Sequence, residues 1–461
     1  MAAQHSTAFL SYAGADAETA AMVVAGLLEA GVSVWWDRGR IDWGGNWIDE
    51  LQQGLTQAAA YLILVGRSGI RRWVKLELDV ALKRHVDDGL PIFTLLLPGV
   101  RPEDLPPFLA TVQARAIPLD PSAADFTALA QALQRPRPPA PAVPAQTTER
   151  EPFPGLEAYQ RADAPFFFGR ELETLQALKL FGPTPGGGYN RWLQVEGGSG
   201  TGKSSLVRAG LLPAISGGWL GEDEGRRPNL HWDIAVPMRP GTQPLLNLAT
   251  TLAEPLGVDV QTLDRAFRDS TDDAGRALLL ALRDRRRVPP DHDVVLVVDQ
   301  FEELFTLVRD PDLRTRFDAL LGNALADLDG PLHLITTIRT DFLHRLCELP
   351  QLRRMLAESS MGRYLLLPID ARGLTVVVGS AVRAAGLRWS DEELPQEIVA
   401  EAADEPGALP LVANLLRLMW QRRSPEGVLS RHLYTELGGV GGALATSADR
   451  LLTTLGPADG E

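Results

Sequence analysis

The residues best suited to chemistry lie in a glycine-rich stretch near the middle of the chain, Val195–Ser205. It fits the pattern G-x-x-x-x-G-K-[ST], and the residues expected to bind are Gly197, Gly200, Gly202, Lys203, Ser204 and Ser205. Such a turn lets successive backbone N–H groups converge on phosphate oxygens, and a helix beginning there adds a favourable dipole. Lys203 would neutralise the outer phosphates, and the Ser204 hydroxyl would bind Mg²⁺. The stretch therefore predicts a nucleotide site.

A second group of polar residues follows an apolar run in the second half of the chain. Five apolar residues, Val294–Val298, end in Asp299, which is typical of a central parallel strand that presents a carboxylate beside the glycine-rich turn. Asp299 is expected to hold Mg²⁺ through water, and Glu302 or Glu303 to polarise the attacking water. Alternatively, one of these two glutamates only caps the helix that follows.

A third apolar run, Leu332–Arg339, is also predicted to be a strand. Thr337 and Arg339 lie at its end, where they could sense the γ-phosphate of a bound nucleotide. Arg339 could equally form an ordinary ion pair with Asp341.

The elements that position these residues belong to the second of two α/β regions. In the first region, strands and helices alternate, and Gly31 ends a helix at residues 17–30. Strands are predicted at 7–13, 32–37, 60–65, 91–97 and 114–119. This alternation indicates a doubly wound α/β domain of flavodoxin-like build, which binds ligands at the C-terminal ends of its strands.

Four polar residues of this first region lie at or after the C-terminal ends of predicted strands and are candidates for ligand contacts: Tyr12, Asp16, Asp37 and Ser68. Three of them also have a structural alternative. Asp16 could cap the helix after it, Asp37 could anchor a loop, and Ser68 could serve a turn.

The first region resembles a bacterial TIR domain over residues 5–135. The resemblance rests on Phe9–Ala13, Val34–Asp37 and Trp73–Leu78. TIR domains are either NAD⁺-cleaving enzymes or assembly scaffolds, and the enzymes carry a glutamate four residues after a tryptophan. The resemblance implies that Glu77 is the catalytic residue and that NAD⁺ is the substrate.

The chemistry of such a site is consistent with one carboxylate. Trp73 and Glu77 lie on one helical face, so an indole and a carboxylate would line one cleft. Nicotinamide departs neutral and needs no acid, so a single glutamate can stabilise the oxocarbenium charge. Alternatively, Glu77 is a solvated surface charge.

Trp43, beside two glycines, could belong to a mobile lid over NAD⁺ or to a contact between TIR domains.

A proline-rich segment, Arg135–Ala145, separates the two regions and predicts a semi-extended linker about 30 Å long at ~3.1 Å per residue. Beyond it, residues 152–445 resemble the STAND class of P-loop NTPases. That resemblance implies that Gly169 and Arg170 lie near the adenine of ATP or ADP and that Arg339 is a sensor. It also implies that Pro410 rests on the base in the closed state, and that helices from 371 to 420 form a lid.

The expected organisation is a TIR domain (1–134), a linker (135–150), a P-loop NTPase core (151–345) and a helical lid with the start of a winged-helix region (346–461). A length of 461 residues suits two or three domains.

The net charge of −14 argues against generic nucleic-acid binding. A single cysteine, Cys347, with no leader or membrane-spanning pattern, favours a soluble, cytoplasmic protein.

Taken together, the resemblances imply a TIR NAD⁺ hydrolase that an ATP/ADP-switched STAND module controls by self-association, in bacterial antiphage defence, in response to an unidentified trigger. The main alternative is a non-enzymatic TIR scaffold with a STAND switch. Another alternative is an ATPase that hydrolyses ATP rapidly and steadily, with its TIR domain serving only as a docking module. The chain is expected to be either a shortened protein or one whose sensor lies elsewhere.

Overall fold

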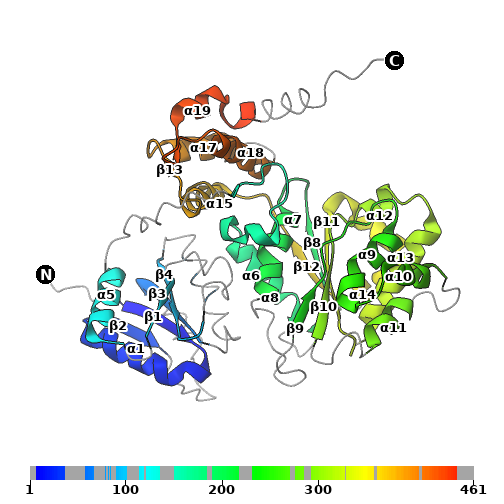
Figure 1. Ribbon diagram of the computed structural model, residues 1–461, viewed down its shortest axis with the longest axis horizontal. Helices are drawn as coiled ribbons and strands as arrows, with labels where there is room; N and C mark the ends of the chain where they lie inside the picture. The colour runs from blue at the N-terminus through cyan, green and yellow to red at the C-terminus, as the bar shows by residue number, and fades with distance from the viewer. Residues whose placement is uncertain are drawn as a thin grey trace.

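The computed structural model of this chain describes most residues between 7 and 443. The described ranges are 7–36, 58–66, 78, 81, 84, 90–100, 114–118, 121–134, 150–183, 189–216, 231–269, 276–284, 292–327, 329–357, 361–403 and 407–443. Figure 1 shows two parallel sheets with helices packed against them, and a group of helices near the C-terminal end. Among the described helices, none combines the length and the apolar character needed to cross a lipid bilayer.

The N-terminal sheet has five parallel strands in the order β2-β1-β3-β4-β5. Its elements are β1 (Thr7–Tyr12), η1 (Gly14–Asp16), α1 (Ala17–Glu29), β2 (Ser33–Trp36), β3 (Ala60–Val65), β4 (Ile92–Leu96), β5 (Ala114–Ala116) and α5 (Ala123–Gln134). This strand order is the flavodoxin-like one, so the predicted fold class is confirmed. All six residues of β3 are buried, which explains why this run is apolar throughout.

The second sheet also has five parallel strands, in the order β12-β8-β11-β10-β9. The strands are β8 (Trp192–Gly197), β9 (His231–Ile234), β10 (His292–Val298), β11 (Leu332–Arg339) and β12 (Gly362–Leu365). β11 lies between β8 and β10, so the strand before the glycine-rich loop and the strand before Asp299 are not direct neighbours. The sheet also extends past residue 345, where the sequence placed the end of this core, because β12 pairs with β8.

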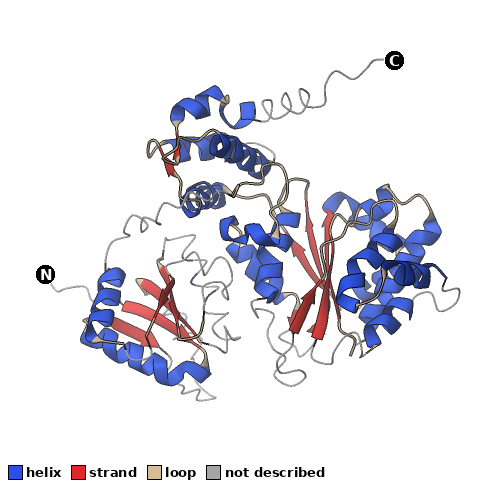
Figure 2. Cartoon of the chain, viewed as in Figure 1, coloured by secondary structure: helices blue, strands red, loops and turns tan. Residues whose placement is uncertain are grey.

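Helices cover both faces of the second sheet, as Figure 2 shows. One face carries α6 (Glu171–Lys179) and a continuous helix built from α7 (Lys203–Ser205), a wide π segment η4 (Leu206–Leu211) and α8 (Leu212–Ser216). The other carries α9 (Pro244–Leu256), α10 (Val260–Asp269), α11 (Ala277–Arg283), α13 (Pro311–Ala326) and α14 (Pro350–Ala357). Residues of β10 alternate between the layers: Val294, Leu296 and Val298 on the second face, Val295 and Val297 on the first.

Shorter elements complete this part of the chain. They are η3 (Arg161–Phe166), β6 (Gly182–Pro183), β7 (Tyr189–Asn190), α12 (Glu303–Thr306) and η6 (Thr340–Glu348). β6 and β7 form a small antiparallel pair, and α12 and η6 follow directly after the ends of β10 and β11. Two of the segments that interest us for chemistry therefore lie at the C-terminal edge of the sheet, where ligands of parallel sheets bind.

The C-terminal helices enclose a separate apolar cluster. They are α15 (Ala371–Val376), η7 (Val377–Ala381), α16 (Val382–Ala384), α17 (Leu394–Ala403), α18 (Ala408–Gln421) and α19 (Arg431–Glu436), with a short pair β13 (Arg388–Trp389) and β14 (Val428–Leu429). Three phenylalanines from the segment before α6 insert into this cluster: Phe153, Phe166 and Phe168. The segment that follows the proline-rich linker is therefore part of the core of these helices.

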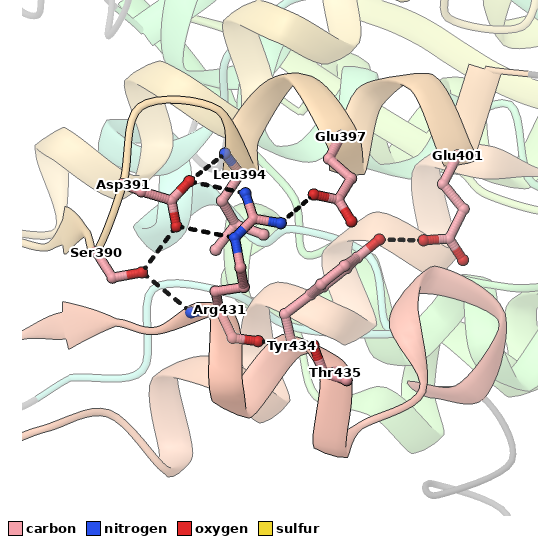
Figure 3. Close-up of polar contacts among 8 residues, drawn as sticks. All are labelled: Ser390, Asp391, Leu394, Glu397, Glu401, Arg431, Tyr434 and Thr435. Atoms are coloured by element: carbon pink, nitrogen blue, oxygen red, sulfur yellow. Dashed lines mark hydrogen bonds and ion pairs between the residues drawn. The ribbon is translucent and has the colours of Figure 1, made fainter.

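Polar contacts bind α19 to α17 and to the turn before it (Figure 3). The Arg431 guanidinium pairs with Asp391 at 2.9 Å and with Glu397, and the Tyr434 hydroxyl donates to Glu401. Asp391 also accepts a hydrogen bond from the backbone N–H of Leu394 at 2.9 Å. These bonds hold the pKa of Asp391 below its usual value, and the bond from Arg431 is the main cause.

Candidate functional site

The glycine-rich loop joins the end of β8 to the start of α7, which is the strand–loop–helix context that its pattern requires. Gly200 and Gly202 have φ angles of +75° and +92°, a region that residues with a Cβ rarely adopt. The Lys203 ammonium donates to the carbonyl oxygens of Gly197 at 2.9 Å and Gly198 at 2.6 Å. The loop thus folds around its own lysine. Partial burial lowers the pKa of Lys203, against the opposing effect of nearby Glu302.

Asp299 is the centre of the polar contacts beside this loop. Its side chain is 1% exposed, and its Oδ1 accepts hydrogen bonds from the hydroxyls of Ser204 at 2.8 Å and Thr337 at 2.6 Å. Its Oδ2 pairs with the Arg208 guanidinium at 2.8 Å. Ser204 and Asp299, which the sequence assigned to the same cation, therefore lie together. Thr337 contacts this carboxylate directly, in addition to being a candidate phosphate sensor.

The turn after Asp299 has an unusual backbone. Gln300 has a φ of +54°, the one positive value among the described non-glycine residues. Its N–H donates to the Thr337 hydroxyl at 2.9 Å, and the N–H of Phe301 donates to the Thr337 carbonyl at 2.8 Å. The end of β11 thus holds a strained turn that carries the next two candidates, Glu302 and Glu303.

The two glutamates have different partners, and neither side chain caps α12. Glu302 stands at the N-cap position without a capping bond, and its Oε2 accepts from the backbone N–H of Arg339 at 3.3 Å. Glu303 Oε2 accepts from the N–H of Gly241 at 3.1 Å. The expectation that one of them is a helix cap is wrong, because the end of β11 and the segment before α9 offer competing donors. Burial raises the pKa of Glu302, against the lowering effect of nearby Lys203 and Arg339.

Arg339 forms the ion pair that the sequence left open. Its guanidinium contacts the Asp341 carboxylate through two nitrogens, at 3.1 and 2.8 Å. Both side chains are exposed to solvent. This pairing raises the pKa of Arg339 and lowers that of Asp341. A role as phosphate sensor would require Arg339 to exchange this partner for the nucleotide.

The start of α18 lies directly against the glycine-rich loop. A Cβ on Gly202 would be 3.1 Å from Cδ2 of Leu409, and one on Gly200 would be 3.6 Å from Cγ of Pro410. The helix begins after Gly407, which has a φ of +78°. Pro410 therefore lies beside the glycine-rich loop, on the side that the C-terminal helices cover.

Gly169 and Arg170 have mainly structural contacts in this arrangement. A Cβ on Gly169 would be 2.8 Å from the Gly373 carbonyl, so glycine is needed where α6 meets α15. Arg170 is 4% exposed, pairs with Glu173 and donates to the carbonyls of Thr201 at 3.2 Å and Leu367 at 3.0 Å. Its buried Nε has no hydrogen-bond partner. Arg170 thus holds the glycine-rich loop, which places it next to the nucleotide site.

The donor set at this site fits a nucleotide with Mg²⁺. Magnesium prefers hard oxygen ligands, and in nucleotide sites it takes one or two protein groups together with phosphate oxygens and water. The Ser204 hydroxyl and the Asp299 carboxylate, 2.8 Å apart, supply two such groups. In the described part of the chain, no cluster of three or more His, Cys, Asp or Glu side chains forms a self-sufficient metal site. Binding of a cation at Ser204 and Asp299 would therefore depend on further oxygen ligands from the nucleotide phosphates.

The candidates of the N-terminal sheet are described only in part. Asp37, Trp43, Ser68, Trp73 and the proposed catalytic Glu77 lie outside the described residues. Tyr12 ends β1, with its ring 6.0 Å from that of Trp36 at the end of β2.

Asp16 does not cap α1, although it stands at the N-cap position. Its carboxylate lies against Gly66 after β3 instead, since a Cβ there would overlap Asp16 Oδ1. Asp16 and Tyr12 are therefore both placed at the carboxyl edge of this sheet, where a flavodoxin-like fold binds ligands.

Sequence reasoning missed Arg208. It lies five residues after Lys203, in the otherwise apolar stretch Leu206–Leu211. A charged residue inside a helix that is buried on the sheet needs a partner, and that was the signal available in the sequence. What the sequence could not show was that the partner is Asp299.

Comparison with known families gives two matches. A family described as Novel STAND NTPase 1 matches residues 152–461, and a TIR domain family matches residues 8–133. The first match covers more than half of the chain. No curated protein matches.

Several solved structures are similar to parts of the chain. A TIR-STING receptor from C. gigas is 20% identical, with a TM-score of 0.24, over 28% of this chain and 39% of the receptor, so the chain spans about two fifths of the receptor's length. The ORC2 protein of Aeropyrum pernix, in ADPNP–ADP complexes, is 15% identical, with a TM-score of 0.39, over 60% of this chain and 67% of that protein.

A Walker-type ATPase of Pyrococcus abyssi is 15% identical, with a TM-score of 0.37, over 64% of this chain and 74% of that protein. The strand–loop–helix at Lys203 and the carboxylate of Asp299 are the parts that an NTPase needs for nucleotide binding. The chain belongs to the Novel STAND NTPase 1 family and carries a TIR domain before its NTPase domain.

Proposed function

We propose that this chain is a TIR NAD⁺ hydrolase whose activity is controlled by an ATP/ADP-switched STAND module, and that it acts in antiphage defence by depleting NAD⁺. The observation that supports nucleotide control is the contact of Leu409 and Pro410 with the glycine-rich loop. A helix that rests on the phosphate-binding loop forms a lid, and a lid can respond to what the loop binds. The STAND family membership and the TIR domain support the two halves of the proposal.

The closed arrangement is assigned to the ADP-bound, resting state. The side chains of Leu409 and Pro410 pack against Gly202 and Gly200. This is where the β- and γ-phosphates of a nucleotide are expected. ATP adds a phosphate and its charge beneath this lid. ATP can shift the equilibrium only if it binds the open state better than the closed one, so the two nucleotides must differ in affinity between states.

The residues of the loop have distinct roles in this proposal. Lys203 would exchange its carbonyl partners for phosphate oxygens, and Ser204 and Asp299 would together hold the cation. Mg²⁺, when bound, neutralises phosphate charge at this point. Glu302 orients the attacking water, since Glu303 is held by Gly241. Slow hydrolysis would return the module to its ADP state.

Opening of the lid is proposed to let neighbouring chains associate and cluster their TIR domains. Clustering completes NAD⁺ sites in which Glu77 stabilises the oxocarbenium charge as nicotinamide leaves, and in which Trp73 forms one wall. Tyr12 and Asp16 are proposed to contact the same ligand, and their position at the carboxyl edge of the N-terminal sheet supports this.

The test is NAD⁺ loss catalysed by the full chain at high protein concentration, with Mg²⁺ and either ATP or ADP. We expect loss with ATP, little loss with ADP, and none with Glu77→Ala. The exposed residue Glu29 of α1 offers a matched control, Glu29→Ala, which should retain activity. If NAD⁺ stays intact while ATP drives oligomer formation, the chain is a scaffold. Rapid, steady ATP turnover would contradict the switch.

A further inference from the structure

The buried carboxylate of Asp299 needs a cation, and the loop lysine is not in contact with it. Lys203 donates to the carbonyls of Gly197 and Gly198. Among the described residues, the charged partner within ion-pair distance of Asp299 is Arg208, at 2.8 Å; the Asp299 side chain is 1% exposed and that of Arg208 is 15% exposed. Charge-assisted bonds of this kind are among the strongest in proteins, and more so away from water. Arg208 therefore sets where this carboxylate points.

The two oxygens of Asp299 are used differently. Oδ1 faces the hydroxyls of Ser204 and Thr337, and Oδ2 faces Arg208. Ser204 and Arg208 are four residues apart on one helix, so both reach the carboxylate from the same side of that helix. A guanidinium fixed on Oδ2 leaves Oδ1 directed at the serine that is expected to bind the cation.

Arg208 is itself held by the segment that precedes α6. Its second terminal nitrogen donates to the Gln160 side-chain oxygen at 3.0 Å. Neighbouring contacts keep this segment along the helix: the N–H of Tyr159 donates to the Ser205 hydroxyl at 3.2 Å, and Arg161 donates to the Ser216 hydroxyl at 2.7 Å. The π segment Leu206–Leu211 widens the helix at Arg208, as π turns often do at functional sites.

We propose that Arg208, held by Gln160, is a positioning residue for Mg²⁺ at the nucleotide site. It contacts neither nucleotide nor cation, and acts by fixing the Asp299 carboxylate. The proposal rests on the nucleotide-binding role given to this loop in the proposed function. It predicts that Arg208 matters for the gain in nucleotide affinity that Mg²⁺ brings, and not for the part that the loop amides and Lys203 provide.

The test is the binding of a non-hydrolysable ATP analogue to the full chain, measured by calorimetry in EDTA and in excess Mg²⁺. In Arg208→Ala we expect the magnesium-dependent gain to fall roughly tenfold or more, the scale of a charge-assisted hydrogen bond, with affinity in EDTA unchanged. Arg208→Lys should restore part of the gain, because an ammonium can pair with Oδ2 but lacks the second arm. Gln160→Ala, which leaves the ion pair in place, should lose a smaller part.

The matched control is Arg283→Ala, which breaks another arginine–carboxylate pair, between the last residue of α11 and Asp327 just after α13, at 2.7 Å. Its magnesium-dependent gain should equal that of the unmodified chain. Three results would overturn the proposal: an equal loss in EDTA and in Mg²⁺, an unchanged gain in Arg208→Ala or Gln160→Ala, or a larger gain. If Arg208→Ala does not fold, the lysine and Gln160 variants decide. No binding by the unmodified chain would instead refute the nucleotide role itself.

Discussion

The side chain of Glu302 accepts a hydrogen bond from the backbone N–H of Arg339, with 3.3 Å between the nitrogen and Oε2. This bond ties the turn after β10 to the end of β11. It also places the Glu302 carboxylate at the edge where Lys203 and Asp299 lie, close enough for the ammonium of Lys203 to influence its pKa. Glu303, one residue on, is instead attached to Gly241.

Glu302→Gln should therefore abolish most nucleotide hydrolysis while leaving nucleotide binding intact. General-base or water-orienting carboxylates contribute about 10²–10⁴-fold to rate, so we expect a loss of at least about 100-fold. Phosphate release under single-turnover conditions measures this rate of hydrolysis. Glu303→Gln is the matched control, and its rate should stay within a few-fold. A reversed order of effects would assign the water to Glu303.

Lys203→Ala should remove most nucleotide affinity. Lys203 carries the positive charge of the loop, and its bonds to Gly197 and Gly198 are the ones that phosphate oxygens would replace. Loss of such a charge-assisted contact should raise Kd by about 100-fold or more. Titration with ADP gives the measurement. Lys179→Ala, an exposed lysine at the end of α6, changes the same charge and should bind normally.

Leu409→Ala should speed the release of bound nucleotide. Leu409 packs on the loop at Gly202, and its truncation weakens the lid without touching a phosphate contact. Partial loss of one apolar contact is worth about 1 kcal/mol, so the rate should rise about five-fold. Leu411→Ala is the comparison, since both leucines are partly buried against the C-terminal cluster. Equal release rates in the two variants would show that the lid contact does not retain nucleotide.

The Asp391–Arg431 pair should make the stability of the C-terminal helices depend on pH. The pKa of Asp391 lies below its usual value, so the folded state favours the ionised carboxyl. The stabilisation is fully present above the unfolded pKa of about 4, and is lost as pH falls through the lower, folded pKa. The thermal melting point of Asp391→Asn should be lower than that of the unmodified chain near pH 7. The difference between the two melting points should be smaller at pH 3.

An exposed carboxylate at the end of α10 provides the control for that experiment. Asp269→Asn changes the same net charge and should melt like the unmodified chain at both pH values. A melting-point difference for Asp391→Asn that persists unchanged to pH 3 would show that its cause is not the ion pair.

The sequence by itself determined the elements that are set by local pattern. The continuous apolar run Ala60–Val65 forms a strand buried on both faces, and the run before Asp299 forms β10. The glycine pattern before Lys203 correctly predicted a tight loop followed by a helix, because glycine adopts the positive φ angles seen at Gly200 and Gly202 without a steric cost.

Only the tertiary structure decided how these elements meet. The order β8-β11-β10 inserts one strand between the loop and Asp299, and the ion pair of Arg208 with Asp299 joins residues 91 positions apart. The partners of Arg170, Glu303 and Asp16 were likewise out of reach of the sequence, because each side chain had several plausible donors or acceptors nearby in the chain. Strand pairing and helix packing choose among such partners through contacts between distant residues, and these have no local signature.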